Sequence, residues 1–251
     1  MRVDEFTSFK ALASVNINGL WVPGNSAPSQ LGRFIEPAIF YNSDFPDFEL
    51  SKRGTLTKCR LNDHYFGLVT VHQLSDFNND QLVLFNEKKQ IIHSAGHVVY
   101  ASDKNGNEEK YDLRLFDFTS AIENGEYSSS DWFDLTAHMY ESDDFENPIL
   151  LAFGYPTSEQ LHDYEQKHIK SVWAYLYGKQ HSSLVSDRMT FKVTNSDEIE
   201  VDGLSGGAVF SIGLDKQLKA QLMFSGVVTN ASQTFVNYLP AEKVMEFVAQ
   251  L

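Results

Sequence analysis

The chain has 251 residues, 42% of them hydrophobic and 13% aromatic, which supplies a sizeable core and excludes disorder by composition. Its 20 basic and 34 acidic residues give a net charge of −14 at pH 7, which repels a phosphate backbone, so we expect no nucleic-acid partner. Cys59 is the single cysteine, which excludes a disulfide within the chain.

Residues 1–53 are predicted to form an N-terminal extension to the main fold. A short helix is expected over 4–13, followed by a loop at Gly24, Pro28 and Gly32, because glycine and proline interrupt regular structure. We interpret this segment as a structural extension or a surface for a partner.

From Gly54 onward, short apolar segments alternate with turn sequences such as Asn105-Gly106-Asn107, a pattern typical of an all-β barrel or sandwich. A first β domain is predicted over 54–121, an acidic, serine-rich connection over 122–146, and a second β domain over 147–251 that ends in an amphipathic helix. The expected strands are 55–61, 65–71, 81–85, 90–100 and 113–116 in the first domain, and 147–154, 171–177, 188–193, 208–212, 221–228 and 234–238 in the second.

A serine framed by glycines is the first candidate for chemistry. Ser205 lies between Gly203 and the pair Gly206 and Gly207. Glycines let the backbone turn tightly and bring its N–H groups close to a ligand. Nucleophilic chemistry needs both an exposed hydroxyl and N–H donors directed at a developing negative oxygen.

Two upstream residues could activate this hydroxyl. His72 ends the apolar run 66–71, and Asp112 begins another strand-like run. A serine hydroxyl becomes a good nucleophile when a neutral imidazole takes its proton, and a carboxylate that fixes the tautomer of the imidazole assists. Asp117 and Asp103 are alternative carboxylates for that role.

Together these segments resemble the chymotrypsin/trypsin-like serine protease superfamily, in the order found there and over residues 54–251. Gly203-Leu204-Ser205-Gly206-Gly207 resembles the Gly-x-Ser-Gly-Gly motif of the nucleophile. Val69-Thr70-Val71-His72 resembles the strand end that carries the base, and Asp112-Leu113-Arg114-Leu115 the strand that carries the carboxylate. Further likenesses are Gly154-Tyr155-Pro156 to a Gly-x-Pro turn, Gly226-Val227-Val228-Thr229 to the strand lining the substrate cleft, and 240–251 to the terminal helix.

The resemblance implies two six-stranded antiparallel β-barrels, with the active site between them and a C-terminal helix. It further implies a serine endopeptidase in which Ser205 attacks a peptide carbonyl, His72 transfers the proton and Asp112 orients His72. The backbone amides of Gly203 and Ser205 would form the oxyanion hole, and no metal or cofactor would be needed. The expected partners are a protein or peptide substrate and a regulatory protein that restrains the enzyme.

The resemblance also implies where substrate binds. Thr229, Asn230 and Ala231 would line one wall of the primary pocket, whose floor is expected near residues 197–200. A carboxylate at that floor would select Lys or Arg, whereas Ile199 would select apolar side chains, and both alternatives stay open.

Two positions depart from the family motifs. Leu204 replaces the acidic residue that precedes the serine in secreted digestive members, so their zymogen switch is not expected. Gln73 follows the histidine, where those members have a cysteine.

The expected location is the cytoplasm of a bacterium or an organelle, without membrane contact. The N-terminus has no apolar signal core, no apolar run approaches the ~18 residues of a membrane span, and no disulfide is possible. The alternative functions are a catalytically silent peptide-binding or scaffolding module of the same fold, and an unrelated β protein.

Overall fold

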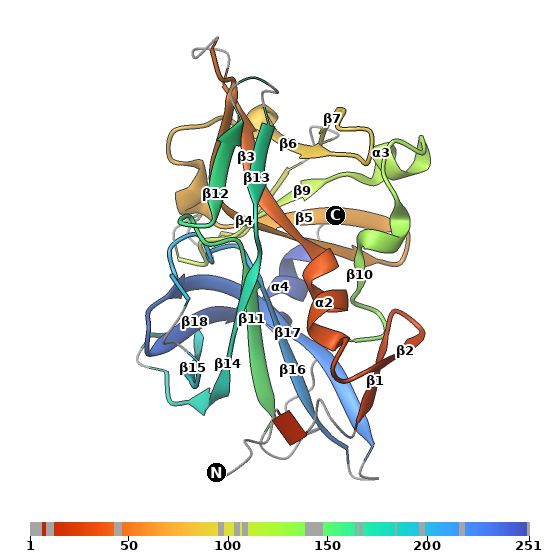
Figure 1. Cartoon of the computed structure of the whole chain (residues 1–251), viewed down its shortest axis with the longest axis vertical. Helices are drawn as coiled ribbons and strands as arrows, with labels where there is room; N and C mark the ends of the chain where they lie inside the picture. Colours follow the sequence, from red (N-terminus) through yellow and green to blue (C-terminus); the bar gives the residue numbers. More distant parts are fainter. Residues whose placement is uncertain are drawn as a thin grey trace.

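The structure, a computed structural model, describes residues 7–8, 13–42, 47–94, 98–102, 106, 110–138, 148–163, 165, 168–183, 185–195, 199–215 and 219–249. A curved sheet and a closed barrel make up most of it, and they occupy the upper and lower halves of Figure 1. This architecture is β-rich and compatible with the trypsin-like fold that the sequence motifs resemble.

The second β domain is a closed barrel of six antiparallel strands in the order β11-β14-β15-β18-β17-β16. All six segments expected as strands here are strands, so this prediction is confirmed. Alternate side chains such as Leu150 and Ala152 fill the interior, because successive residues of a strand point to opposite faces. The strands are β11 (Ile149–Gly154), β14 (Ala174–His181), β15 (Met189–Val193), β16 (Ala208–Leu214), β17 (Ala220–Ala231) and β18 (Phe235–Pro240).

The first β domain is an eight-stranded sheet curled into a half-barrel, so the expectation of two closed six-stranded barrels is confirmed for one barrel only. The expected single strand 90–100 is divided into β7 and β8, which lie at opposite ends of the path β7-β6-β3-β4-β5-β9-β8. These two strands are consecutive in the chain, so the five-residue step from His93 to Val98 keeps the sheet ends within about 18 Å. The strands are β3 (Ile35–Tyr41), β4 (Leu50–Leu61), β5 (His64–Val69), β6 (Leu82–Phe85), β7 (Ile91–His93), β8 (Val98–Tyr100), β9 (Arg114–Asp117) and β10 (Phe133–Asp134), the last parallel to β4.

This sheet begins earlier than predicted. Strand β3 lies inside the segment 1–53 and pairs antiparallel with both β4 and β6, so the sheet includes residues before the predicted boundary at residue 53. Pro37 concealed the strand, because proline lacks the N–H that a central strand needs. The register between β3 and β4 shifts between Pro37 and Ile39, and this irregularity accommodates the proline.

The preceding residues form a hairpin and a short helix rather than the expected loop. Pro28 lies in the first turn of α2, where the missing N–H of proline is not needed, so a helix can form there. The helix expected over 4–13 falls mostly outside the described residues. The elements are β1 (Ser14–Ile17), β2 (Leu20–Pro23), α2 (Ala27–Leu31) and the 3-10 helix η1 (Gly32–Phe34).

The predicted connection 122–146 contributes to the core. Phe133 is fully buried, and its ring centroid lies 5.1 Å from that of Phe34 and 4.9 Å from that of Phe210 in β16. The connection therefore packs between sheet and barrel, and residues 139–147 lie outside the described part of the chain. It also holds the end of α3 (Thr119–Glu123) and the 3-10 helix η4 (Ser129–Asp131).

The amphipathic C-terminal helix is confirmed as α4 (Ala241–Val248), with Val244, Phe247 and Val248 buried. The ring of Phe247 lies 5.2 Å from that of Tyr111, so the helix supports the segment that leads into β9. In the described ranges, no helix is long and apolar enough to cross a membrane. The other elements are the 3-10 helices η2 (Val71–Leu74) and η3 (Asn79–Gln81) and the hairpin of β12 (Gln160–Asp163) and β13 (His168–Ser171).

Candidate active site

Strand pairing brings His72 and Asp112 together. Strands β5 and β9 are antiparallel neighbours that pair Val69 with Arg114, so the end of β5 lies beside the start of β9. His72 follows β5 in η2, and Asp112 precedes β9 by two residues. A contact between positions 40 residues apart thus follows from one pair of strands.

Asp112 holds His72 through two hydrogen bonds. The ring Nδ1 lies 2.7 Å from Oδ2 of Asp112, and the backbone N–H of His72 donates to Oδ1 at 3.1 Å. Because an ionised carboxylate only accepts hydrogen bonds, Nδ1 carries the proton and Nε2 of the neutral ring keeps a lone pair. The hydrogen bond to Asp112 raises the pKa of His72, while burial of the half-exposed ring acts in the opposite direction.

The hydroxyl of Ser205 is not bonded to His72 in this structure. Its Oγ donates to the carbonyl oxygen of Thr229 at 3.1 Å, and Nε2 of His72 lies 3.4 Å from the hydroxyl oxygen of Thr70. Among the described residues, the structure contains no hydrogen bond between Ser205 and His72.

The loop around Ser205 leaves two backbone donors unoccupied. The amides of Leu204, Gly206 and Gly207 donate to the carbonyl oxygens of Val201, Val228 and Leu204, respectively. In the part of the chain that the structure describes, the N–H groups of Gly203 and Ser205 have no acceptor. Gly203 and Gly206 have φ angles of 93° and 81°, a region that favours glycine. Two free amides beside a serine hydroxyl could stabilise a negative oxygen.

Threonines on β4 fix the position of this loop. The hydroxyl of Thr55 donates to the carbonyl oxygen of Gly203 at 2.8 Å, and that of Thr57 donates to Gly206 at 2.8 Å. The backbone N–H of Thr55 also donates to the carbonyl oxygen of Ser205 at 3.0 Å. Neither threonine was predicted as a site residue, although two threonines at alternate positions of a predicted strand were the available signal.

Of the two alternative carboxylates, Asp117 is bonded to the backbone two residues further along the chain. Oδ1 of Asp117 accepts the backbone N–H of Thr119 at 2.8 Å, at the start of α3. Asp103 lies outside the described residues.

The predicted substrate residues divide into two groups. Thr229 and Asn230 lie at the site, where they line a cavity with His72 and Asp112. Ile199 and Ala231 instead pack against the interior of the barrel, and the backbone carbonyl of Ile199 accepts from Gln233 at 3.1 Å. Of the residues expected at the floor, 197 and 198 lie outside the described part of the chain.

The cavity has a volume of about 690 Å³ and lies between the sheet and the barrel. Arg188, which precedes β15, contributes a cationic side chain to its lining. The lining comprises Val71, His72, Ser75 and Asp112 from the first domain, and Val185, Arg188, Thr229, Asn230 and Asn237 from the second.

Within the described ranges, no cluster of three or more His, Cys, Asp or Glu side chains could hold a metal ion. No protein-family model matches the sequence, and no curated protein matches it either.

Proposed function

We propose that the protein is a serine endopeptidase with Ser205 as nucleophile, His72 as general base and Asp112 as the carboxylate that orients it. The observation that carries the proposal is the pair of hydrogen bonds from His72 to Asp112, at 2.7 and 3.1 Å. They leave Nε2 as the proton acceptor of the ring, which is the state that serine activation requires. The free amides of Gly203 and Ser205 support the same assignment.

The reaction would proceed in two halves. His72 Nε2 takes the proton of Ser205 as Oγ bonds to the peptide carbonyl carbon, and the amides of Gly203 and Ser205 hold the resulting oxyanion. His72 then gives the proton to the departing amine as the C–N bond breaks, which leaves an acyl-enzyme. A water molecule attacks the acyl carbon, transfers a proton to His72, and the ester bond breaks as Ser205 regains its proton.

An open strand edge favours a peptide as the substrate. Strand β18 pairs with β17 as far as Ala231, whereas the pairing of β16 with β17 ends at Val227. Among the described residues, 229–231 therefore have a strand partner on one side only. An extended peptide could add to such an edge through backbone hydrogen bonds, beside the hydroxyl of Ser205.

The second candidate is a catalytically silent peptide-binding module. The hydrogen bond from Ser205 to Thr229 favours it, because the nucleophile must leave that carbonyl before His72 can take its proton. A change of the Ser205 side chain between staggered χ1 rotamers would break this bond without moving the backbone.

A fluorophosphonate probe tests the proposal, because it forms a covalent bond with an activated serine only. We expect labelling of the unmodified protein and none of Ser205→Ala or His72→Ala. Ser75→Ala is the matched control, since Ser75 lines the same cavity and should leave labelling intact. Absence of labelling in the unmodified protein, with peptide binding retained, would favour the silent module. Labelling that survives Ser205→Ala would reject Ser205 as the nucleophile.

A further inference from the structure

Arg188 places an unpaired positive charge in the wall of the cavity beside His72 and Asp112. One terminal nitrogen of its guanidinium donates to the carbonyl oxygen of Lys110 at 2.9 Å, and the other to that of Asp187 at 3.4 Å. Both acceptors are neutral, so they orient the guanidinium without cancelling its charge. Within the described ranges, Arg188 forms no ion pair.

The two nearby carboxylates are engaged with other groups. Asp187 pairs with the ammonium group of Lys110 at 3.4 Å. Asp112 is held by His72 through both of its oxygens. Partial burial lowers the pKa of Arg188, whereas the charges of Asp112 and Asp187 act in the opposite direction. The guanidinium therefore stays charged in the cavity with capacity for a further anion.

The neighbouring polar group suits a carboxylate as well. Asn230 accepts a hydrogen bond from Nδ2 of Asn237 through Oδ1 at 2.7 Å. This leaves Nδ2 of Asn230 as a donor with no acceptor among the described residues. Val71 and Val185 supply apolar wall that the methylene groups of a side chain could contact. Guanidinium and amide donors above an apolar wall match a short acidic side chain.

We propose that this cavity is a specificity subsite for an aspartate or glutamate side chain of the substrate, bound by Arg188 with assistance from Asn230. The proposal rests on the proposed peptidase function and names the substrate class of the same site. A volume of 690 Å³ corresponds to an edge of roughly 9 Å, which is the length of about three residues of an extended strand. The acidic residue therefore lies within about three residues of the cleaved bond.

The first test compares cleavage of internally quenched peptides that differ only by Asp, Asn or Lys at each of the three positions on either side of the bond. At one position, we expect kcat/KM for Asp to exceed that for Asn about tenfold, since charge-assisted hydrogen bonds are roughly twice as strong as neutral ones. Arg188→Gln should reduce this ratio to near one, and Arg188→Glu should make Lys the preferred residue. Arg188→Lys keeps the charge and should retain part of the ratio. It therefore tests the role of the charge even if loss of the bond to Lys110 disturbs folding in the other two variants.

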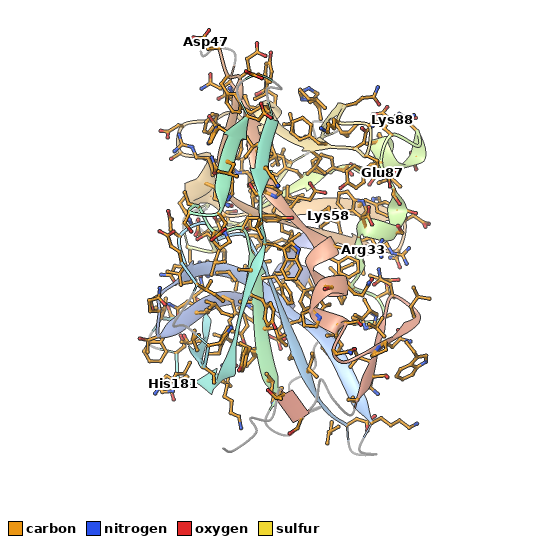
Figure 2. All side chains as sticks on the ribbon, in the orientation of Figure 1. Arg33, Asp47, Lys58, Glu87, Lys88 and His181 are labelled. Atoms are coloured by element: carbon orange, nitrogen blue, oxygen red, sulfur yellow. The ribbon has the colours of Figure 1, made fainter. Side chains whose placement is uncertain are left out.

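Arg33→Gln is the matched control, because Arg33 pairs with Asp131 beside α2, outside the cavity, and should leave the ratio unchanged (Figure 2). A ratio near one in the unmodified enzyme at all positions, or a ratio retained in Arg188→Gln, would overturn the proposal.

A binding assay separates this proposal from the peptidase assignment. Fluorescein-labelled hexapeptides that carry Asp or Asn are titrated with the Ser205→Ala protein, and the dissociation constants are read from anisotropy. Tighter binding of the Asp peptide that disappears in the Ser205→Ala/Arg188→Gln double variant supports the subsite, even if the unmodified protein cleaves nothing. Cleavage of neutral peptides with equal affinity for Asp and Asn would overturn the subsite and leave the peptidase proposal standing.

Discussion

The side-chain amide of Gln73 donates to the carbonyl oxygen of Ser205 at 2.9 Å, and so joins the turn that carries His72 to the loop that carries the candidate nucleophile. The same Nε2 donates to the carbonyl oxygen of Thr55 at 3.1 Å, while Oε1 accepts the N–H of Thr70 at 2.7 Å. Gln73 is only 3% exposed, so water cannot replace these bonds. One buried amide thus cross-links three segments of the site.

Replacement of Gln73 by Leu should lower both stability and activity. Loss of the amide leaves buried backbone groups without partners, which costs about 2 kcal/mol in the free energy of unfolding measured with urea. We expect kcat to fall more than KM rises, because the change displaces Ser205 relative to His72 rather than a substrate contact. Gln81→Leu is the matched control, since Gln81 forms the same capping arrangement with Asn78 but is not bonded to Ser205. Equal effects of the two variants on kcat would contradict the cross-link.

The activity should depend on the ionisation of His72. Its hydrogen bond to Asp112 raises its pKa above 6.5, and general-base catalysis needs the neutral ring, so kcat/KM should rise with pH and level off above the raised value. Asp112→Asn should shift this rise to lower pH and reduce kcat about 10⁴-fold, as in comparable triads. Asp117→Asn should change neither the pH dependence nor kcat, because Asp117 is bonded to the backbone N–H of Thr119 at the start of α3. A pH profile that is identical in Asp112→Asn would exclude His72 as the titrating base.

The same pKa shift affects stability with a defined sign. Because the pKa of His72 is raised in the folded state, its hydrogen bond to Asp112 stabilises the fold fully below pH 6.5. This stabilisation is lost as pH rises through the raised pKa. The side chain of His72 is 52% exposed, so solvent screens the interaction and the effect should be small. The effect is the difference in unfolding free energy between the unmodified protein and His72→Ala, measured by urea unfolding across this pH range.

A methyl group at Gly206 should disrupt the nucleophile loop. Its φ of 81° is unfavourable for alanine, and the added Cβ would overlap the carbonyl oxygen of Thr55. Gly125 has a φ of 71° with open space around it, so Gly125→Ala is the matched control. It measures only the cost of a positive φ for alanine, about 1 kcal/mol. We expect Gly206→Ala to cost at least about 3 kcal/mol in thermal or urea unfolding. Comparable losses in the two variants would show that the close approach to Thr55 is relaxed in solution.

A partly buried ion pair should make Lys58 important for stability. Lys58 lies near the centre of the molecule (Figure 2), is 2% exposed, and donates to Glu36 and to the hydroxyl of Tyr127 at 2.9 Å each. Lys58→Met would leave the carboxylate of Glu36 without its cation, which costs about 3 kcal/mol in unfolding free energy. The double variant Lys58→Met/Glu36→Gln should recover part of this loss.

The exposed pair of Lys243 and Glu246 serves as the comparison for Lys58. Its side chains are 31% and 56% exposed, so Lys243→Ala should cost less than about 1 kcal/mol. If the double variant of Lys58 and Glu36 were no more stable than Lys58→Met alone, packing rather than charge would explain the loss.

Patterns within a few residues of sequence determined much of this fold. Short apolar segments between turn sequences predicted the six barrel strands, and one apolar helical face predicted the terminal helix. The positions of His72 at a strand end and of Ser205 among glycines were also readable, since turns and strand ends depend on local residue types. Function itself stays a proposal built on these residues.

Only the tertiary structure decided which distant groups meet. Pro37 concealed β3, whose place depends on β4 and β6, and the split of 90–100 into β7 and β8 depends on where the sheet ends. The contact between Gln73 and Ser205 spans 132 residues, and that between Arg188 and Lys110 spans 78. Such contacts arise from packing and hydrogen-bond satisfaction across the whole core, which no short stretch of sequence encodes.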